Sequence, residues 1–211
     1  MTWTDPLATA FETGDVLSEA NLGTYVLDNL YSLMHPLEAP TTATLTVTST
    51  TAETTLYSVT VPANAMGTNG AVRMEMRGQF AHNNAAGDTI TLRAKFGGVT
   101  FWELTSNLGN ANSATANPWW LNIEVFNEGA TNAQDAFLEG YVWSAAVAAN
   151  ASSGIGGLIT NGFDLAGAST ITSMAIDTTA NQTLALTVQW STSAAALQWT
   201  RRRAQTFIGK W

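Results

Sequence analysis

The chain has 211 residues, of which only 11% are charged, and its formal net charge is −8. This length is enough to bury a core in one large domain or two small ones. An acidic chain repels phosphate backbones, so we expect no nucleic-acid partner. The sequence contains no cysteine, which excludes disulfides, thiolate metal sites and cysteine nucleophiles. It has no signal-peptide pattern and no apolar run near the roughly 20 residues of a membrane span. We therefore expect synthesis in a cytoplasm and no membrane partner.

The charged fraction is well below the roughly 25% that is typical of globular proteins. Thr, Ala, Asn, Ser and Gly take the place of charged residues, so few like charges would keep copies of the chain apart. This composition favours a chain that packs against other copies, and an ordinary β-sandwich is the open alternative.

Residues 1–37 are predicted to form an anchor with one amphipathic helix. Ser18 suits a helix N-cap, and His35 precedes a proline, which disfavours helix at that position. The helix is therefore expected to end near Met34. The expected docking residues of the anchor are apolar or aromatic: Trp3, Phe11, Leu22, Val26, Leu30 and Leu33.

Residues 38–43 are predicted to be a linker, and residues 44–211 a single antiparallel β domain. Alternation of apolar and polar residues predicts eight to ten strands. The expected strands lie at 44–50, 56–61, 72–80, 90–96, 99–102, 119–126, 136–147, 170–176, 184–190 and 197–208. Gly97-Gly98 has the spacing of a two-residue hairpin turn, and 107–117 is expected to be a surface loop. With no helical crossover pattern, the prediction is a mainly β sandwich of the jelly-roll type.

The anchor contains several short motifs in a fixed order. They are Trp3-Thr4-Asp5-Pro6, an aromatic-to-valine turn at 11–16, Ala20-Asn21-Leu22, and Asp28-Asn29-Leu30-Tyr31-Ser32-Leu33. In this order they resemble the start of minor tail and fibre-like proteins of tailed bacteriophages. The Leu-Asn order in mid-helix and an Arg before Asp-Asn-Leu are missing, because this chain has Asn21-Leu22 and Leu27. The resemblance implies a virion component.

A second stretch of the chain carries a similar indication. Residues 176–179 form a loop that leads into the strand-like run at 182–191. This stretch resembles the end of jelly-roll domains in viral fibres and minor structural proteins. Because those heads are usually trimers, the resemblance implies a homotrimer.

No pattern in the sequence indicates catalysis, so we expect no catalytic residue, no metal and no cofactor. His35 and His82 are the only histidines, and no Gly-x-Ser-x-Gly motif is present. Oxygen-rich loops lack a calcium-binding motif. Carboxylates that could serve a glycosidase are Glu103, Glu124, Glu128, Asp135 and Glu139. A small polysaccharide depolymerase is therefore a distant alternative.

The eight tryptophans include the adjacent pair Trp119 and Trp120. Neighbouring residues of a strand point to opposite faces, so one member should face outward or into an interface. An outward aromatic ring could stack on a sugar, which makes Trp119 and Trp120 candidates for glycan contact. Core filling or subunit packing is the alternative.

Arg201, Arg202 and Arg203 form the only basic run. In a regular strand, Arg201 and Arg203 would share one face and Arg202 would take the other. A core face cannot hold unpaired guanidinium groups, so these side chains are expected to form ion pairs with carboxylates of neighbouring subunits. DNA contact is the alternative, and the net charge disfavours it.

Together these observations predict a non-enzymatic bacteriophage virion protein. It would be a tail-associated fibre or receptor-binding component that presents a trimeric jelly-roll head. Its expected partners are copies of itself, other virion proteins through the anchor, and a host surface glycan or receptor. A capsid decoration protein is the first alternative, and a free glycan-binding module is a further one.

Overall fold

The computed structural model describes residues 35–37, 39–84, 87–106, 113–143, 162–164 and 172–209. These residues contain 12 β-strands and no α-helix, and the strands pair antiparallel throughout. The prediction of a mainly β, antiparallel fold is confirmed. The predicted helix and the docking residues Trp3, Phe11, Leu22, Val26, Leu30 and Leu33 lie outside the described residues.

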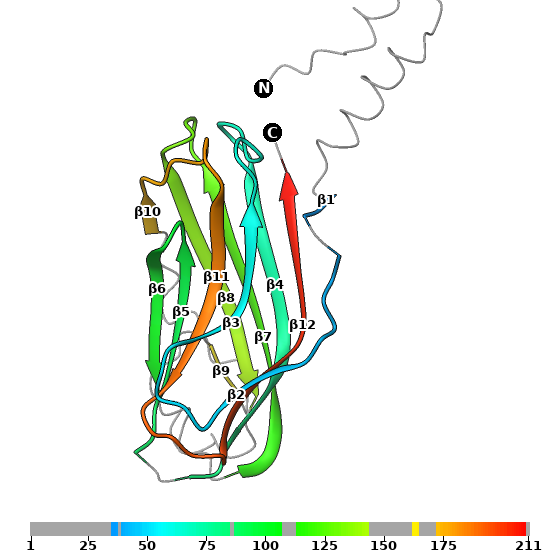
Figure 1. The fold of residues 1–211 in the computed structure, drawn as a ribbon, viewed down its shortest axis with the longest axis vertical. Helices are drawn as coiled ribbons and strands as arrows, with labels where there is room; N and C mark the ends of the chain where they lie inside the picture. Colours follow the sequence, from blue (N-terminus) through cyan, green and yellow to red (C-terminus); the bar gives the residue numbers. More distant parts are fainter. Residues whose placement is uncertain are drawn as a thin grey trace, which may run out of the picture.

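The strands form two sheets (Figure 1). In the 8-stranded sheet the order is β1 (His35–Pro36), β12 (Leu197–Gly209), β4 (Ala71–His82), β7 (Ser113–Asn127), β8 (Gln134–Trp143) and β10 (Thr172–Met174). Two more strands pair with this sheet: β2 (Leu45–Thr48) with β12, and β9 (Gly162–Asp164) with β8. In the 4-stranded sheet the order is β3 (Thr54–Val61), β11 (Gln182–Trp190), β5 (Ile90–Phe96) and β6 (Val99–Ser106).

The two sheets lie face to face and bury a single core between them (Figure 1). On β4, Val72, Met74 and Met76 point inward and are fully buried. The residues between them, such as Arg73 and Glu75, point outward and are half-buried. The period of two residues along the strand therefore separates a core face from an outer face, and the fold is a β-sandwich.

Three large aromatic rings pack together in the core near one end of the sandwich. The rings of Trp119 and Trp199 stack with centroids 5.1 Å apart, and Phe80 lies 5.7 Å from Trp199. Trp119 also donates a hydrogen bond from Nε1 to the carbonyl oxygen of Thr200 at 3.2 Å. Gly78 lies directly opposite Trp119 on β4, and the missing side chain there makes room for the indole ring.

The predicted hairpin at Gly97-Gly98 is confirmed. The two glycines connect β5 to β6, and their φ angles are 57° and 82°. A two-residue turn of this kind needs positive φ at both central positions, which glycine adopts without steric cost.

The predicted surface loop at 107–117 is wrong in its last five residues. β7 begins at Ser113, which pairs with His82 at the end of β4. Small polar residues with little apolar content led to the loop prediction. Pairing with the long neighbouring strand β4 supplies the hydrogen bonds that extend β7 into this stretch.

A buried network of amide side chains joins the loops at the opposite end of the sandwich. Gln134 donates from Nε2 to Asn127 Oδ1 at 2.9 Å and accepts a hydrogen bond from the Ile176 amide at 2.7 Å. Asn127 in turn donates to Thr178 Oγ1 at 3.0 Å, and Thr178 donates to the Thr131 carbonyl at 2.7 Å. The network therefore ties β7 and β8 to the segment that precedes β11.

The replacement Gln134→Ala is expected to lower the free energy of unfolding by about 1 to 2 kcal/mol. It leaves Asn127 Oδ1 without the donor from Gln134 and the Ile176 amide without its acceptor. Urea denaturation measures the change. The control is Asn132→Ala at an exposed position of the same loop, which should change the free energy by less than about 0.5 kcal/mol. Equal effects of the two variants would contradict the role of the network.

Candidate functional site

The outer face of the 8-stranded sheet carries a row of four large side chains across four neighbouring strands. Arg203 of β12 lies opposite Arg77 of β4, Arg77 opposite Trp120 of β7, and Trp120 opposite Tyr141 of β8. We call these four residues the arginine–aromatic row. The row crosses three gaps of roughly 4.8 Å between strands and so spans about 14 Å.

A β-bulge at Arg202 places the arginines of this row. The register between β12 and β4 shifts between Arg201 and Arg203, so that Arg202 has no partner of its own. The extra residue reverses the alternation: Arg201 is buried, while Arg202 and Arg203 are exposed. The prediction that Arg201 and Arg203 share one face is therefore wrong.

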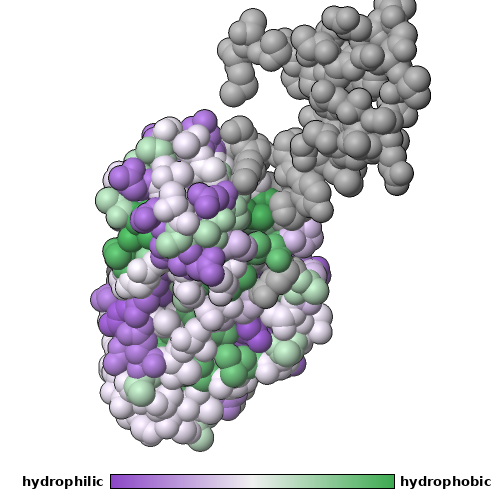
Figure 2. Space-filling model, turned by 45° about the horizontal axis from the view of Figure 1, so that its top comes forward, coloured by the Kyte–Doolittle hydropathy of each residue, from purple (hydrophilic) through white to green (hydrophobic). Residues whose placement is uncertain are grey.

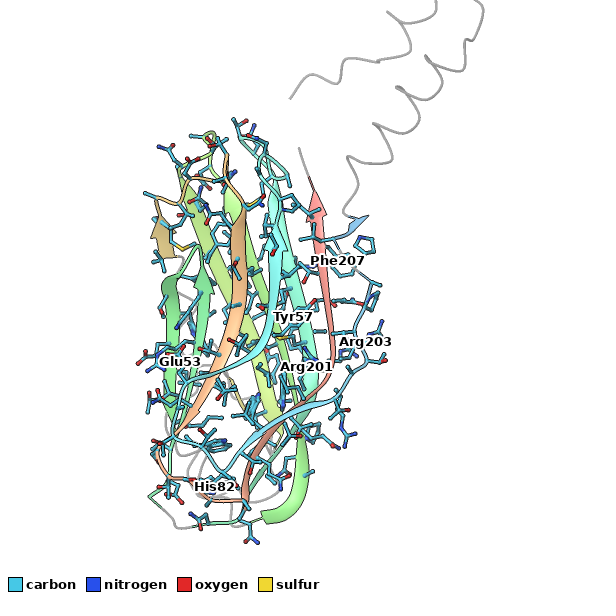
Figure 3. The ribbon with its side chains drawn as sticks, viewed as in Figure 1. Glu53, Tyr57, His82, Arg201, Arg203 and Phe207 are labelled. Atoms are coloured by element: carbon cyan, nitrogen blue, oxygen red, sulfur yellow. The ribbon has the colours of Figure 1, made fainter. Side chains whose placement is uncertain are left out.

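Arg201 lies inside the sandwich beside Tyr57, and Arg203 lies on the outside (Figure 3). The guanidinium of Arg201 donates to the carbonyl oxygens of Leu56 at 3.3 Å and Ala43 at 2.9 Å. Its Cζ atom lies 5.2 Å from the centroid of the Tyr57 ring. Contrary to our expectation, the core holds a guanidinium that has no carboxylate partner in the described part of the chain, because main-chain carbonyls and an aromatic ring accept it. Its hydrogen bonds are made within the subunit.

Three arginines of the outer face, Arg77, Arg202 and Arg203, have no carboxylate partner among the described residues. Arg202 donates from Nε and Nη2 to Gln79 Oε1 at 3.2 and 2.9 Å, and Arg203 donates to Gln205 Oε1 at 3.1 Å. Arg77 is exposed and lies directly opposite Arg203. Like charges placed opposite each other on neighbouring strands repel, so the pair is poised to accept an anion. Inter-subunit ion pairs of Arg202 and Arg203 remain a prediction.

A hollow of about 250 Å³ opens on this face between β4 and β12. It is lined by Arg77 and Arg203 and by Glu75 and Gln205. Glu75 is already neutralised, because Arg73 Nη2 lies 3.3 Å from its Oε1 and Gln205 donates to its Oε2 at 3.1 Å. The unbalanced charge in the hollow is therefore positive.

The adjacent residues Trp119 and Trp120 point to opposite faces of the larger sheet, as expected for neighbours in a strand. Trp119 is 2% exposed and belongs to the core, so glycan contact through its ring is excluded in the described fold. Trp120 is half-buried on the outer face and stacks on Tyr141, with ring centroids 5.8 Å apart and planes 10° apart. Trp120 therefore stays the candidate for glycan contact, now with a second aromatic ring beside it.

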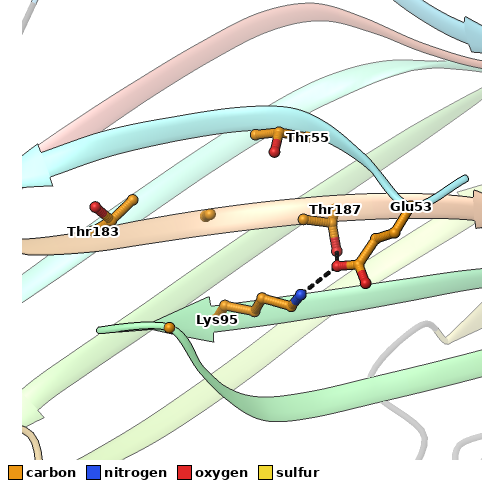
Figure 4. Close-up of a pocket in the computed structure, with 7 residues that line it drawn as sticks. Glu53, Thr55, Lys95, Thr183 and Thr187 are labelled. Atoms are coloured by element: carbon orange, nitrogen blue, oxygen red, sulfur yellow. Dashed lines mark hydrogen bonds and ion pairs between the residues drawn. The ribbon is translucent and has the colours of Figure 1, made fainter.

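A second hollow, of about 390 Å³, lies on the outer face of the smaller sheet (Figure 4). Its lining residues are mostly small or polar: Glu53, Thr55, Lys95, Gly98, Thr183, Ala185 and Thr187. Glu53 accepts hydrogen bonds from Lys95 Nζ and from Thr187 Oγ1, and Arg93 Nη1 lies 3.4 Å from its other oxygen. Hydrophilic surface gathers on the left of Figure 2, the side on which Figure 1 has β5 and β6. The charges of this hollow satisfy each other, so it is the weaker candidate for a ligand site.

The hydrogen bonds from Lys95 and Thr187, together with the charge of Arg93, lower the pKa of Glu53 below its ordinary value of 4.5. A carboxyl group with a lowered pKa stabilises the fold above pH 4.5, and this contribution is lost as the pH falls through the folded-state pKa.

We expect Glu53→Gln to reduce the free energy of unfolding at pH 7 by up to about 1 kcal/mol, because the group is near the surface. The difference from the wild type should shrink as the pH falls below 4.5. Urea denaturation at several pH values tests this, with Glu128→Gln at an exposed loop position as control. A difference that does not change with pH would contradict it.

Of the carboxylates considered for a glycosidase pair, Glu103 lies on the smaller sheet, whereas Glu124, Asp135 and Glu139 lie on β7 and β8 of the larger sheet. Glu103 points outward from β6 and binds Arg93 at 2.7 Å, on the outer face of the smaller sheet. Glu124 lies opposite Arg73 on the outer face of the larger sheet. These two carboxylates therefore cannot act together on one glycosidic bond. His82 is buried at the end of β4, where Nε2 lies 3.3 Å from the Asp88 carbonyl oxygen.

The chain matches no protein-family model, no curated protein and no solved structure. Within the described residues, no helix is long and apolar enough to cross a membrane. In the same residues, no group of three or more His, Asp or Glu side chains is arranged to hold a metal ion. The candidate site consists of the arginine–aromatic row and the hollow of about 250 Å³ beside it.

Two residues of the row, Arg77 and Tyr141, were missed as site residues by sequence analysis. The outward position of Arg77 follows from the alternation of residues 72–80, so its exposure could have been predicted. Its position beside Arg203 and Trp120 depends on the register of three strands that are far apart in the sequence. Periodicity within one strand shows which face a residue lies on, but it does not distinguish registers that differ by two residues.

Proposed function

We propose that the chain is a non-enzymatic structural component of a bacteriophage virion. In this proposal residues 1–37 anchor it to the particle, and the β-sandwich is a jelly-roll head that is displayed as a homotrimer. The head acts as a tail-associated fibre or receptor-binding component. The motif order of the anchor and the low content of charged residues support the virion assignment.

The arginine–aromatic row is the observation that carries the binding role. It places exposed guanidinium groups beside a stacked Trp–Tyr pair on the broad outer face of a sheet. Aromatic rings and arginines are the residue types that are enriched at recognition surfaces, because both supply large contact area and directed interactions. A rigid sheet also holds such side chains in fixed positions.

A capsid decoration protein is the second candidate. The described part of the chain is one sandwich without a repetitive shaft, which suits a protein that covers capsid subunit junctions. In that role the same outer face would contact the shell or a neighbouring copy.

Immunogold electron microscopy distinguishes the two positions. An antibody raised against residues 44–211 is applied to particles from the source culture, with pre-immune serum as control. Label at the tail tip supports the receptor-binding role, and an even coat on the head supports decoration. Particles without label would overturn the virion assignment.

A further inference from the structure

The distribution of positive charge in this chain is uneven. Only 8 residues are Lys or Arg, against 16 Asp or Glu. Arg77, Arg202 and Arg203 nevertheless lie together near the middle of β4 and β12, on one outer face, and none of them has a carboxylate partner among the described residues. The chain as a whole repels anions, because its net charge is −8. The three arginines therefore form a local exception to the charge of the whole chain. The local charge is therefore suited to a specific anionic group.

Two glutamine side chains hold the guanidinium groups of Arg202 and Arg203 in place. Gln79 accepts two hydrogen bonds from Arg202, and Gln205 accepts one from Arg203. Both amides leave further guanidinium N–H groups unused, since a guanidinium has five donors. Two neighbouring guanidinium groups can bind the two oxygens of one carboxylate with directed, charge-assisted hydrogen bonds.

The hollow beside these arginines has room for more than a carboxylate. Its volume is about 250 Å³, which is many times the space that a single water molecule needs. Along the row, Trp120 follows Arg77 directly, and Tyr141 covers the far side of Trp120. A ligand with its acid group in the hollow therefore extends onto an aromatic ring.

We infer that the arginine–aromatic row and Arg202 form a binding site for a carboxylate-bearing sugar, such as a uronic or sialic acid unit of an acidic polysaccharide. The arginines bind the carboxylate, and Trp120 contacts the C–H groups on one face of the ring, which meet the electron-rich face of the indole. This inference rests on the proposed binding function and names the ligand class. Inorganic polyphosphate lacks the apolar ring face, the net charge of −8 disfavours nucleic acid, and an acidic protein side chain would use the arginines alone.

The test uses the purified full chain with trigalacturonic acid and 3′-sialyllactose, each titrated by calorimetry and by tryptophan fluorescence. The neutral controls are the methyl ester of trigalacturonic acid and lactose. We expect heat release and a change in fluorescence with at least one acidic sugar and neither with its neutral control. Raising the salt concentration should weaken the binding, because the charges are exposed.

The variants Arg77→Gln and Arg203→Gln should each weaken binding about tenfold or more. Trp120→Ala should weaken binding and remove most of the fluorescence change. The matched control is Arg93→Gln, which removes the same charge from the outer face of the other sheet and should leave the affinity unchanged. Circular dichroism of each variant verifies that it is folded.

Several outcomes overturn the inference. One is equal binding of an acidic sugar and its neutral control, and another is the absence of binding to both acidic sugars. A third is a chain that forms oligomers, binds neither acidic sugar, and dissociates on replacement Arg77→Glu, as measured by analytical ultracentrifugation. That result would make this face a contact between copies. The virion assignment is tested separately by immunogold labelling, so acidic sugar binding by a protein absent from particles would refute only the proposed function.

Discussion

Gly78→Ala is expected to destabilise the fold by about 3 kcal/mol or more, which is beyond the usual cost of one added methyl group. A Cβ atom at this position would lie 1.9 Å from the carbonyl oxygen of Thr200 and 2.6 Å from the ring of Trp119. The first contact is with the main chain of β12, which is fixed by pairing along β4, and the second is with a fully buried indole. Neither can move without disturbing the stacked tryptophans.

The measurement is the free energy of unfolding from urea denaturation, followed by tryptophan fluorescence. Gly87→Ala is the matched control, because no atom lies within 4 Å of a Cβ built at that position. It should change stability by less than about 0.5 kcal/mol. If Gly78→Ala were as stable as the control, the packing of Trp119 on β4 would be wrong.

Arg201→Met should lower the free energy of unfolding by about 2 to 3 kcal/mol, although methionine fills a similar volume. The guanidinium donates to the carbonyl of Leu56, which belongs to the edge strand β3 of the smaller sheet. Without it, the Leu56 carbonyl loses this donor, and the cation–π contact with Tyr57 is lost. Part of the loss is recovered, because burying a charged group is itself costly.

Arg202→Met is the control for this variant, since it removes the same group from the next residue, which is exposed. Its effect on stability should be below about 0.5 kcal/mol. The urea midpoint should shift for Arg201→Met while the slope of the transition stays unchanged, as for a variant that alters stability without altering the surface exposed on unfolding. Equal midpoints for the two variants would refute the structural role of Arg201.

Patterns confined to one strand could be predicted from the sequence. The alternation in residues 72–80 and 90–96 correctly placed apolar residues inside, because burial of one face imposes a period of two. The hairpin at Gly97-Gly98 was predicted for a similar reason, since few residues other than glycine adopt its positive φ angles. Local sterics and burial act over a few residues, so a few residues are enough to reveal them.

Features that depend on pairing between distant strands could not be predicted in this way. The bulge at Arg202 is one example, because Leu197 to Ile208 looks like an uninterrupted strand. The start of β7 at Ser113 is another, since it depends on the length of β4. For the candidate site, the same limit applies: Trp120 and Arg203 were singled out, but their common row emerges only from the register of four strands.

The pairing of β1 with the end of β12 brings the two ends of the described sandwich together, as His35 lies opposite Ile208 and Pro36 opposite Phe207. A short linker could therefore join residue 209 to residue 35, while the exposed turn at Gly98 offers a place to open the chain. The resulting circular permutant would keep the order of strands in space and the whole outer face of the larger sheet. The sandwich could equally be inserted as a cassette into a surface loop of another protein.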